Sequence, residues 1–475
     1  MSKMDFCVHR YCRQSEVAGS SFFYSVHWPD GENVRFFLDA GAFQGVNNSY
    51  LNGYFPFKAE KLSFGIVTHL HFDHLGLLPV IVRQGFKGKI YSSYGTANLL
   101  DVALADTVKI EDKQLGRTIA TSEEVEETLE KTVGCAYRKI IKPQIIFFEN
   151  GHLIGAAVIL IIISCPGRED ITILHTGDYK DKNLFFDVDA IPENIKNMKI
   201  SSFVTESTYG NVDSTNSKFD ECLVENTVWA IKRGMTVLYP TFALGRHQEV
   251  LYKIKQIKEK ELIPKETLVV VDGKASQIYN TRFQYSDLGI KLEMKKFMPK
   301  YCKCIPRDLT KKFVRNEIIK NNDPKIIVAP GGMCDYGAAS VYTKKFISDP
   351  NVMIHGVGYA APNSVMYKLL NTLQGETVSC YGDTYIKKCM TKITAEVTSH
   401  GPRDILLRFI NDFPNTMSVS INHGELITQK WFRKSVLENT KLLENQVDIC
   451  SPEKGVVIEA EGITGTFNTK FATSC

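Results

Sequence analysis

The sequence predicts an α/β protein in which a second domain is inserted into the first. Through residue 208, short apolar runs rich in Val, Ile and Phe alternate with helical stretches, which is typical of successive strands and helices. From residue 209 to about 390, helices and strands alternate regularly, as in a parallel α/β domain, and the earlier pattern then returns. We therefore expect residues 1–208 and 391–475 to form one domain around an insert of residues 209–390.

The individual elements follow from the same patterns. In the first segment, strands are predicted over residues 35–38, 62–68, 145–148, 158–164 and 171–175. Thr121 and Glu124 have the spacing of a capping box, which predicts a helix from there to about Lys131. In the insert, a helix is predicted over 244–260 and strands over 236–240, 267–271 and 325–329. The last segment ends in an apolar run at 455–458.

Composition excludes several classes of protein. Of the 475 residues, 44% are hydrophobic and 23% are charged, which is typical of a globular chain rather than a disordered, collagen-like or coiled-coil one. The net charge of +4 gives no strong overall attraction to nucleic acids or anionic membranes. The longest apolar run, 153–163, is too short to span a bilayer, so we expect a buried strand and no membrane partner.

The twelve cysteines do not indicate a disulfide framework, because they are spread over a long chain and form no Cys-x-x-Cys pair. The first ten residues also lack the apolar core of a secretory signal. We therefore expect reduced thiols and a cytoplasmic protein.

Positive charge is concentrated in one segment of the predicted insert. Residues 291–320 contain ten basic and three acidic residues, a local net charge of +7, with Phe297, Tyr301 and Phe313 between them. Basic side chains can bind phosphates and the aromatic ones can stack on bases, so this composition suits nucleic-acid binding. The alternative interpretation is a solvent-exposed helix face. The lysines taken as candidate substrate contacts are Lys295, Lys296, Lys311 and Lys312.

The clearest chemical signal is the segment His69-Leu70-His71-Phe72-Asp73-His74, which follows an apolar run ending at Val67. Three imidazoles and one carboxylate beside a buried strand cost free energy unless something coordinates them. His and Asp side chains together favour zinc or a similar divalent ion over calcium or magnesium. Further ligands are expected at the ends of later predicted strands, and His152 and Asp178 stand at such positions. Taken singly, His152 is more often a turn residue and Asp178 a helix cap.

These motifs, in this order, resemble those of the metallo-β-lactamase superfamily. Other motifs are similar to those of its β-CASP subgroup of nucleic-acid nucleases. They are Thr205-Glu206-Ser207-Thr208-Tyr209-Gly210, Phe242-Ala243-Leu244-Gly245-Arg246, Ala329-Pro330-Gly331-Gly332-Met333, Thr398-Ser399-His400 and Asn422-His423-Gly424-Glu425. The resemblance implies a four-layer αββα metallo-β-lactamase sandwich with an inserted parallel α/β β-CASP domain.

The resemblance also implies two divalent metal ions, Zn²⁺ or alternatively Mn²⁺, that generate a hydroxide for in-line attack on phosphorus. One ion would be held by His69, His71, His152 and Asp178, and the other by Asp73, His74, Asp178 and His423. Asp39 matches the superfamily's first motif and would orient a ligand.

The resemblance further implies that His400 protonates the leaving oxygen and that Glu206 orients His400. The chain departs from the subgroup here, because Gly401-Pro402 follows His400 and the usual acidic residue two positions later is missing. Pro402 restricts the backbone, so the orientation of His400 is expected less firmly than the metal ligands.

His423 favours the RNA branch of the subgroup, because the DNA-processing branch typically carries valine at this position. The implied function is hydrolysis of RNA, single-stranded by expectation, within a homodimer or a larger RNA-processing complex. Arg246 and the Gly331-Gly332 turn are further candidate RNA contacts, and for the glycines a plain tight turn is the alternative. Competing functions are a DNA nuclease of the same subgroup, a small-molecule hydrolase and an inactive RNA-binding scaffold.

Overall fold

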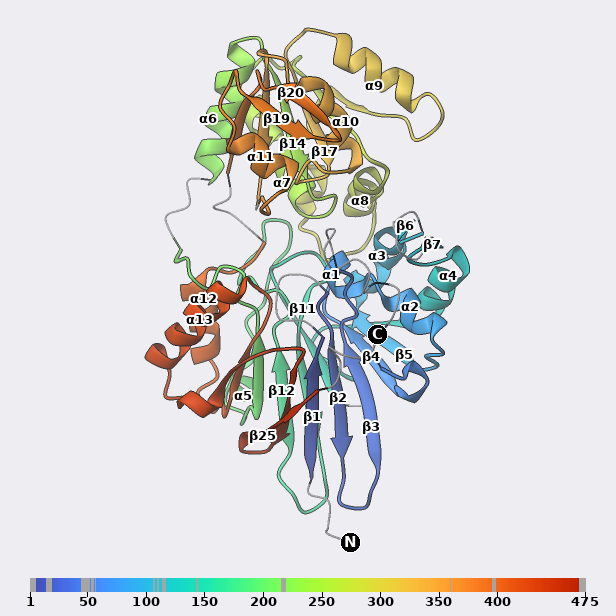
Figure 1. The fold of residues 1–475 in the computed structure, drawn as a ribbon, viewed down its shortest axis with the longest axis vertical. Helices are drawn as coiled ribbons and strands as arrows, with labels where there is room; N and C mark the ends of the chain where they lie inside the picture. The colour runs from blue at the N-terminus through green and yellow to red at the C-terminus, as the bar shows by residue number, and fades with distance from the viewer. Residues whose placement is uncertain are drawn as a thin grey trace. The chain divides into compact units, whose positions relative to one another are not determined.

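The structure is a computed structural model, and it separates the chain into two compact units (Figure 1). Unit 1 comprises Met1–Ser214 and Ser399–Cys475, and unit 2 comprises Thr215–Thr398. The residues that the structure describes are 6–13, 19–43, 52, 55, 57–105, 107–108, 111–112, 117–141, 144–214, 219–358, 360–394 and 399–469. The sequence-based domain boundaries after residues 208 and 390 stay predictions.

Unit 1 is built on two large sheets. The first has the strand order β25-β24-β1-β2-β3-β4-β5-β8. Its strands are β1 (Cys7–Cys12), β2 (Phe22–His27), β3 (Asn33–Leu38), β4 (Phe64–Val67), β5 (Lys89–Ser93), β8 (Thr132–Cys135), β24 (Lys454–Glu459) and β25 (Gly462–Asn468). The second sheet has the order β23-β22-β13-β12-β11-β10-β9. Its strands are β9 (Ile140–Ile141), β10 (Ile145–Glu149), β11 (Ala157–Ile163), β12 (Ile171–His175), β13 (Ser202–Thr205), β22 (Val419–Ile421) and β23 (Val447–Ile449).

The two sheets pack face to face, and helices cover their outer faces. Alternate residues of β1, such as Val8 and Cys12, join Ile159 of β11 and Ile173 of β12 in one buried core. Helices α2 (Leu78–Arg83), α3 (Tyr94–Leu104) and α4 (Ser122–Lys131) lie on the side of the first sheet (Figure 1). Helices α12 (Arg403–Asn411) and α13 (Leu426–Asn439) pack on the second sheet. The predicted αββα sandwich is confirmed.

Short elements complete unit 1. They are α1 (Phe72–Leu75), α5 (Glu193–Lys196) and the hairpin of β6 (Glu111–Asp112) and β7 (Arg117–Thr118). The predicted capping box is formed at α4, since the Glu124 N–H donates to Thr121 Oγ1 (3.3 Å) and the Thr121 N–H donates to Glu124 Oε2 (3.0 Å). Among the described residues, no helix is long and apolar enough to cross a membrane.

Unit 2 is the predicted parallel α/β insert. Its sheet has the order β16-β15-β17-β14-β18-β21, and every neighbouring pair runs parallel. The strands are β14 (Thr236–Thr241), β15 (Leu268–Val271), β16 (Cys302–Cys304), β17 (Lys325–Pro330), β18 (Val352–Gly356) and β21 (Met390–Ile393). The helices are α6 (Phe219–Lys232), α7 (Arg246–Glu259), α8 (Lys274–Tyr285), α9 (Lys311–Lys320), α10 (Gly337–Phe346) and α11 (Val365–Leu370), and β19 (Thr377–Cys380) pairs with β20 (Asp383–Ile386).

The second sheet of unit 1 collects functional side chains at one edge. Strands β12, β13 and β22 run parallel, and β10 shares their direction because both β10 and β12 are antiparallel to β11. The carboxyl ends of these strands therefore lie at the same edge. The loops that follow them carry His152, Asp178, Glu206 and His423.

Candidate metal centre

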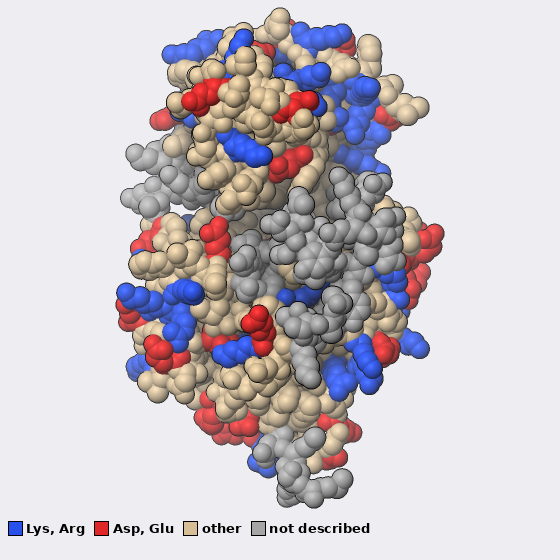
Figure 2. Space-filling view, viewed as in Figure 1, with Lys and Arg blue, Asp and Glu red and all other residues tan. Residues whose placement is uncertain are grey.

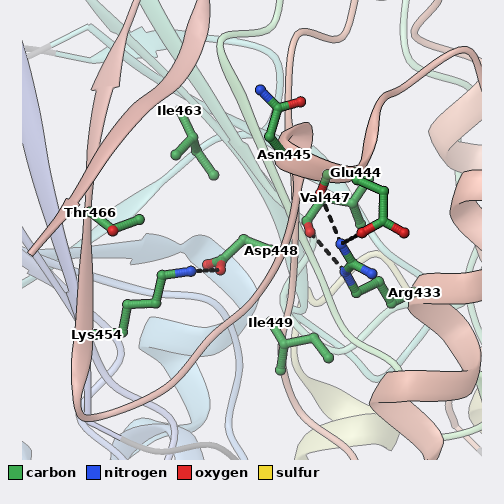
Figure 3. Close-up of a pocket in the computed structure, with 9 residues that line it drawn as sticks. All are labelled: Arg433, Glu444, Asn445, Val447, Asp448, Ile449, Lys454, Ile463 and Thr466. Carbon is green, nitrogen blue, oxygen red and sulfur yellow. Dashed lines mark hydrogen bonds and ion pairs between the residues drawn. The ribbon is translucent and has the colours of Figure 1, made fainter.

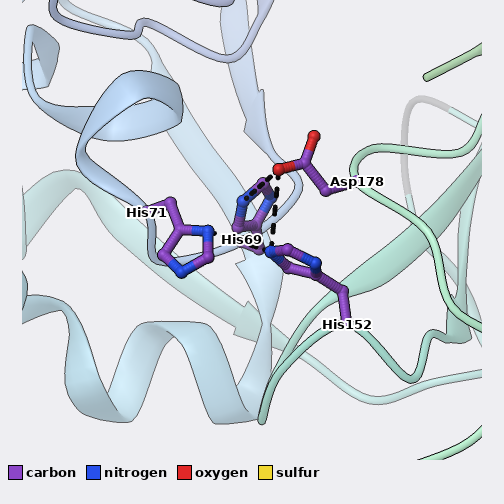
Figure 4. A group of neighbouring side chains, drawn as sticks. All are labelled: His69, His71, His152 and Asp178. Carbon is purple, nitrogen blue, oxygen red and sulfur yellow. Dashed lines mark hydrogen bonds and ion pairs between the residues drawn. The ribbon is translucent and has the colours of Figure 1, made fainter. Parts of the chain in front are cut away.

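Four side chains from three loops of unit 1 converge on one point (Figure 4). His69 Nε2 lies 3.4 Å from Asp178 Oδ2, and His152 Nε2 lies 3.6 Å from the same oxygen. His71 Nδ1 lies 2.9 Å from His152 Nε2. One nitrogen or oxygen of each residue lies within 4.8 Å of the others, a spacing that suits coordination of a single ion.

A second group lies on the other oxygen of the same aspartate. Asp178 Oδ1 is 3.3 Å from His74 Nε2 and 3.6 Å from His423 Nε2. His423 Nε2 also lies 3.3 Å from Asp73 Oδ2. Asp178 therefore stands between the two groups, so the structure brings together all seven residues expected as ligands.

Several of these atoms are buried without a hydrogen-bond partner. Among the described residues, they are His69 Nε2, His74 Nε2 and Asp178 Oδ1, and their short contacts are to other members of the cluster. Leaving a buried polar atom unsatisfied costs about 1–3 kcal/mol. Imidazole nitrogens and carboxylate oxygens are preferred ligands of zinc and similar ions. The cluster thus fits divalent metal binding.

The remaining nitrogens of these histidines are held by neighbouring groups. Asp39 Oδ2 lies 2.7 Å from His74 Nδ1, and the Thr68 N–H and hydroxyl donate to the two Asp39 oxygens (2.8 and 2.7 Å). Such contacts fix the orientation of a metal-binding imidazole. Asp39 therefore contacts a candidate ligand, and its role in orienting that ligand stays a prediction.

Three further contacts were not predicted. Thr68 Oγ1 lies 3.0 Å from His69 Nδ1, Thr208 Oγ1 lies 2.9 Å from His423 Nδ1, and the Ser399 carbonyl lies 2.8 Å from His152 Nδ1. Thr208 stands inside a quoted motif and Thr68 directly precedes His69, so their position beside the candidate ligands was a usable signal. A backbone carbonyl such as that of Ser399 leaves no signal in the sequence.

Two residues of the site adopt a backbone conformation that is uncommon outside glycine. Asp39 has φ of 61° and His423 has φ of 48°. The His423 carbonyl accepts hydrogen bonds from the Ser207 N–H (2.8 Å) and hydroxyl (3.0 Å), which hold this turn. Such conformations cost free energy and cluster at functional sites.

Burial keeps the histidines of the first group neutral, as metal ligands must be. It lowers the pKa of His69 to about 3 and that of His71 to about 4, and it lowers the pKa of His152 well below its usual value. At His74, burial opposes the charge, but Asp178 and Asp39 outweigh it and raise the pKa. Burial likewise opposes ionisation of Asp73, and the hydrogen bond from His423 outweighs it and lowers the pKa.

Beside the cluster, His400 and Glu206 form the predicted pair. His400 Nδ1 lies 2.8 and 3.0 Å from the two Glu206 oxygens, and His400 Nε2 lies 3.8 Å from Asp178 Oδ2. The buried Glu206 carboxylate also accepts from the Tyr179 N–H (2.6 Å) and the Thr208 N–H (3.2 Å). Burial disfavours the imidazolium, but Glu206 and Asp178 outweigh it and raise the pKa of His400 to about 9.

The Gly401-Pro402 segment does not displace His400 from Glu206. Pro402 instead caps α12, and the Gly401 N–H donates to the Tyr179 carbonyl. Glu206 therefore supplies a carboxylate that orients His400.

The basic segment of unit 2 is divided among several elements. Lys295 and Lys296 end a short 3₁₀ helix (Leu292–Lys296), and Lys311 and Lys312 begin α9. Lys296, Lys311 and Lys312 are exposed, whereas Lys295 is half-buried. Basic side chains gather over the α8–α9 region of this unit in Figure 2.

Other residues of that segment face inward. Phe297 is fully buried beside Phe283, so it is not available for stacking on a base as its place in the segment suggested. Arg315 forms a bidentate ion pair with Asp272 (2.6 and 2.9 Å). Tyr301 and Phe313 are exposed.

The other candidate RNA contacts of unit 2 lie after β14 and β17. Arg246 is buried and forms an ion pair with Glu249. The Gly331 N–H donates to the Thr241 carbonyl (2.9 Å), and φ of 118° at Gly331 is a conformation that favours glycine. The tight-turn interpretation therefore accounts for Gly331 without a ligand.

A pocket of unit 1 contains none of the predicted site residues (Figure 3). Its charged side chains are paired with one another or with the backbone. Arg433 donates to the carbonyls of Val447 (2.9 Å) and Glu444 (2.8 Å), and Lys454 donates to Asp448 (2.8 Å). This pocket therefore offers no unpaired charge to a ligand.

Residues 247–369, most of unit 2, match the Beta-Casp domain family. The chain therefore contains a Beta-Casp domain within unit 2. The resemblance read from the motifs is confirmed.

Known proteins are similar over much of the chain. Transcription termination factor FttA of Methanosarcina mazei is 31% identical over 371 residues, which are 74% of this chain and 55% of that protein. Ribonuclease TTHA0252 of Thermus thermophilus is 24% identical over 82% of this chain and 88% of its own length. The metallo-beta-lactamase fold protein YhfI of Bacillus subtilis has 16% identity, a TM-score of 0.26 and coverage of 43% of this chain and 73% of its own. This chain spans about half the length of the FttA proteins it matches.

Proposed function

We propose that this protein is a metal-dependent ribonuclease that hydrolyses phosphodiester bonds of single-stranded RNA. The observation that carries the proposal is the pair of His/Asp groups that share Asp178 beside the Glu206–His400 pair. A similar protein is named a ribonuclease, and others are named transcription termination factors, which supports RNA rather than DNA or a small molecule as substrate.

The residues of the cluster would hold two divalent ions, Zn²⁺ or Mn²⁺. His69, His71, His152 and Asp178 would hold one ion, and Asp73, His74, Asp178 and His423 the other. When bound, such ions lower the pKa of water and neutralise charge on a phosphate. Asp39, Thr68, Thr208 and the Ser399 carbonyl fix the ring orientations, so that little rearrangement is needed on binding.

His400 would donate the proton to the departing ribose oxygen. Its pKa near 9 keeps it protonated at neutral pH, and Nδ1 is held by Glu206. Nε2, on the other side of the ring, is directed toward Asp178 and hence toward the cluster. A proton held at Nε2 is therefore available where the phosphate would react.

Unit 2 would bind the RNA strand through its basic segment. Lys296, Lys311 and Lys312 project into solvent and can neutralise phosphates, with Tyr301 and Phe313 exposed for stacking. Lys295, Arg246 and the Gly332 turn are weaker candidates, because Lys295 is half-buried and donates to the Ser286 carbonyl (3.4 Å) and Arg246 is paired. A cytoplasmic location, and assembly as a homodimer or within an RNA-processing complex, belong to the same proposal.

The test is digestion of matched 5′-labelled RNA and DNA oligonucleotides with and without a chelator. We expect cleavage of RNA, loss of cleavage on chelation and recovery on adding Zn²⁺ or Mn²⁺. Asp73→Ala and His74→Ala should abolish cleavage, because each removes a ligand of the second group. Asp30→Ala is the matched control, since Asp30 is exposed on the turn between β2 and β3.

Product lengths from the same gel distinguish internal cleavage from stepwise removal of 5′ nucleotides. Undiminished turnover in Asp73→Ala or His74→Ala would contradict the assignment of the metal ligands. Preferential cleavage of DNA would contradict the proposed ribonuclease activity and would favour a DNA nuclease of the same subgroup.

A further inference from the structure

The solvent-facing side of α13 carries two large apolar side chains. Helix α13 lies on the outer side of the second sheet of unit 1 (Figure 1), and Phe432 and Val436 bury its inner side. On the solvent-facing side, Ile427 is 63% exposed and Trp431, one helical turn later, is 53% exposed. Exposed apolar side chains that are grouped and bordered by polar ones are typical of contact surfaces.

Two lysines stand on the same side of the helix. Lys430 and Lys434 are both exposed, and Lys434 Nζ lies 5.8 Å from the centre of the Trp431 ring. Because residues three and four apart are neighbours on a helix, these side chains form one stripe, which we call the α13 stripe: Ile427, Lys430, Trp431 and Lys434. Lys434 also lies 3.7 Å from Glu438. Such an exposed ion pair contributes little free energy, so Lys434 can exchange it for another anion.

The α13 stripe is held at a fixed place relative to the metal cluster of the same unit. Helix α13 begins three residues after His423. The buried Gln429 side chain donates to the Gly424 carbonyl (2.8 Å), which ties the first turn of the helix to the turn that carries this histidine. From the helical rise and the length of three linking residues, the Cα of Trp431 lies within about 20 Å of that of His423.

This combination of side chains suits a single strand of RNA. An aromatic ring stacks on a base of any identity, and lysines beside it neutralise the neighbouring phosphates. The positive charges of Lys430 and Lys434 therefore complement the ligand. A folded protein is less well matched, because the two apolar side chains offer far less than the about 800 Å² per partner that a standard protein interface buries.

We propose that the α13 stripe binds the RNA strand on one side of the phosphate that is cleaved. One base would stack on Trp431, and Lys430 and Lys434 would contact phosphates of the nucleotides beside it. This inference rests on the proposed ribonuclease function and adds to it a substrate-binding surface in unit 1.

The test measures binding of a short 5′-labelled single-stranded RNA to the full chain by fluorescence anisotropy, with a chelator present so that no cleavage is needed. Trp431→Ala should weaken binding about 5- to 150-fold, the effect of one lost base stack, and Trp431→Tyr should retain most of the affinity. Trp229→Ala is the matched control and should bind as the unmutated chain does. Trp229 is also exposed, at 37%, and has the Arg233 guanidinium 4.2 Å from its ring centre.

The two lysines are tested by the salt dependence of the same binding. In the double variant Lys430→Ala, Lys434→Ala, the slope of log affinity against log salt should fall by about 0.7 for each phosphate that is no longer neutralised. An unchanged slope would remove the lysines from the RNA contact and overturn the proposal.

Photo-crosslinking of a thiouridine-containing RNA to the unmutated chain locates the strand without any variant. Mass spectrometry should place a crosslink on the peptide that contains Trp431. The proposal would be overturned by no crosslink on this peptide, by full affinity in Trp431→Ala, or by equal losses in Trp431→Ala and Trp229→Ala.

These outcomes are distinguishable from a failure of the proposed function. Cleavage of RNA by a chain that does not use the stripe would overturn this inference and leave the ribonuclease activity standing. Absence of any RNA binding by the unmutated chain would overturn both.

Discussion

At the scale of single residues, Asp39 is a side chain outside the proposed ligand set that contacts one of the proposed ligands, His74. Its carboxylate holds His74 Nδ1 at 2.7 Å and is itself fixed by two hydrogen bonds from Thr68. Its left-handed backbone places the carboxylate beneath the cluster at a cost in free energy. Asp39 is therefore held in a fixed position, and its role can be tested by removing only its charge.

Asp39→Asn should weaken zinc affinity by about 10- to 100-fold while leaving the fold intact. Asn tolerates the left-handed backbone and has the same shape, so the lost interaction with His74 dominates the effect. Calorimetric titration of the metal-free chain with Zn²⁺ measures the change, with Asp30→Asn as control. Equal affinity in Asp39→Asn and the unmutated chain would remove Asp39 from the site.

Glu206→Gln should move the alkaline limb of the activity profile to lower pH. His400 has a raised pKa of about 9, so its proton is present below that pH and is lost as pH rises through it. Without the carboxylate, the pKa of His400 falls by an expected 1–3 units. Measuring kcat from pH 6 to 10 locates the limb in both proteins, and an unmoved limb would show that another group donates the proton.

At the scale of elements, the basic segment shows what a local composition can and cannot predict. Its charge was correctly located in the sequence, and Lys311 and Lys312 emerge at the exposed start of α9. Its aromatic residues are not all available for stacking on bases, because Phe297 is buried against Phe283 whereas Phe313 is exposed. Arg315 pairs with Asp272, 43 residues away, a contact that only the folded sheet brings about.

Reversing the charge of Lys295, Lys296, Lys311 and Lys312 to Glu should raise KM for RNA and flatten its salt dependence. For a single strand, the slope of log affinity against log salt should fall by about 0.7 for each phosphate that the variant no longer neutralises. kcat should stay unchanged, because these residues lie outside the metal cluster. The double variant Lys344→Glu, Lys345→Glu on α10 is the control. An unchanged salt slope in the fourfold variant would show that the basic segment does not bind RNA and is only a solvent-exposed surface.

At the scale of the whole molecule, the predictable part of the site is the part written in contiguous motifs. His69, His71, Asp73 and His74 stand in one loop after an apolar strand, so residue type and position sufficed to find them. His423 was placed only through the resemblance, because 245 residues separate it from Asp178. Apart from Asp39, the partners of these candidate ligands depend on which strand ends share an edge, and the sequence does not state that order.

The buried histidines of unit 2 should make the chain less stable in mild acid. His355 of β18 is buried, and burial lowers its pKa to about 4. Below pH 6.5 the unfolded chain binds a proton that the folded chain does not, so stability falls as pH falls. Each such group contributes about 1.4 kcal/mol per pH unit between its folded and unfolded pKa values.

The variant His355→Gln tests this contribution. It keeps a polar group within reach of Thr394, which lies 2.7 Å from His355 Nε2, and removes the group that binds the proton. Hydrogen exchange of the β18 amides at pH 6 and pH 5, corrected for intrinsic rates, should show a smaller pH dependence in the variant. His247, whose pKa burial lowers to about 3, should preserve part of the slope. Identical slopes in the two proteins would show that His355 is protonated in the folded chain.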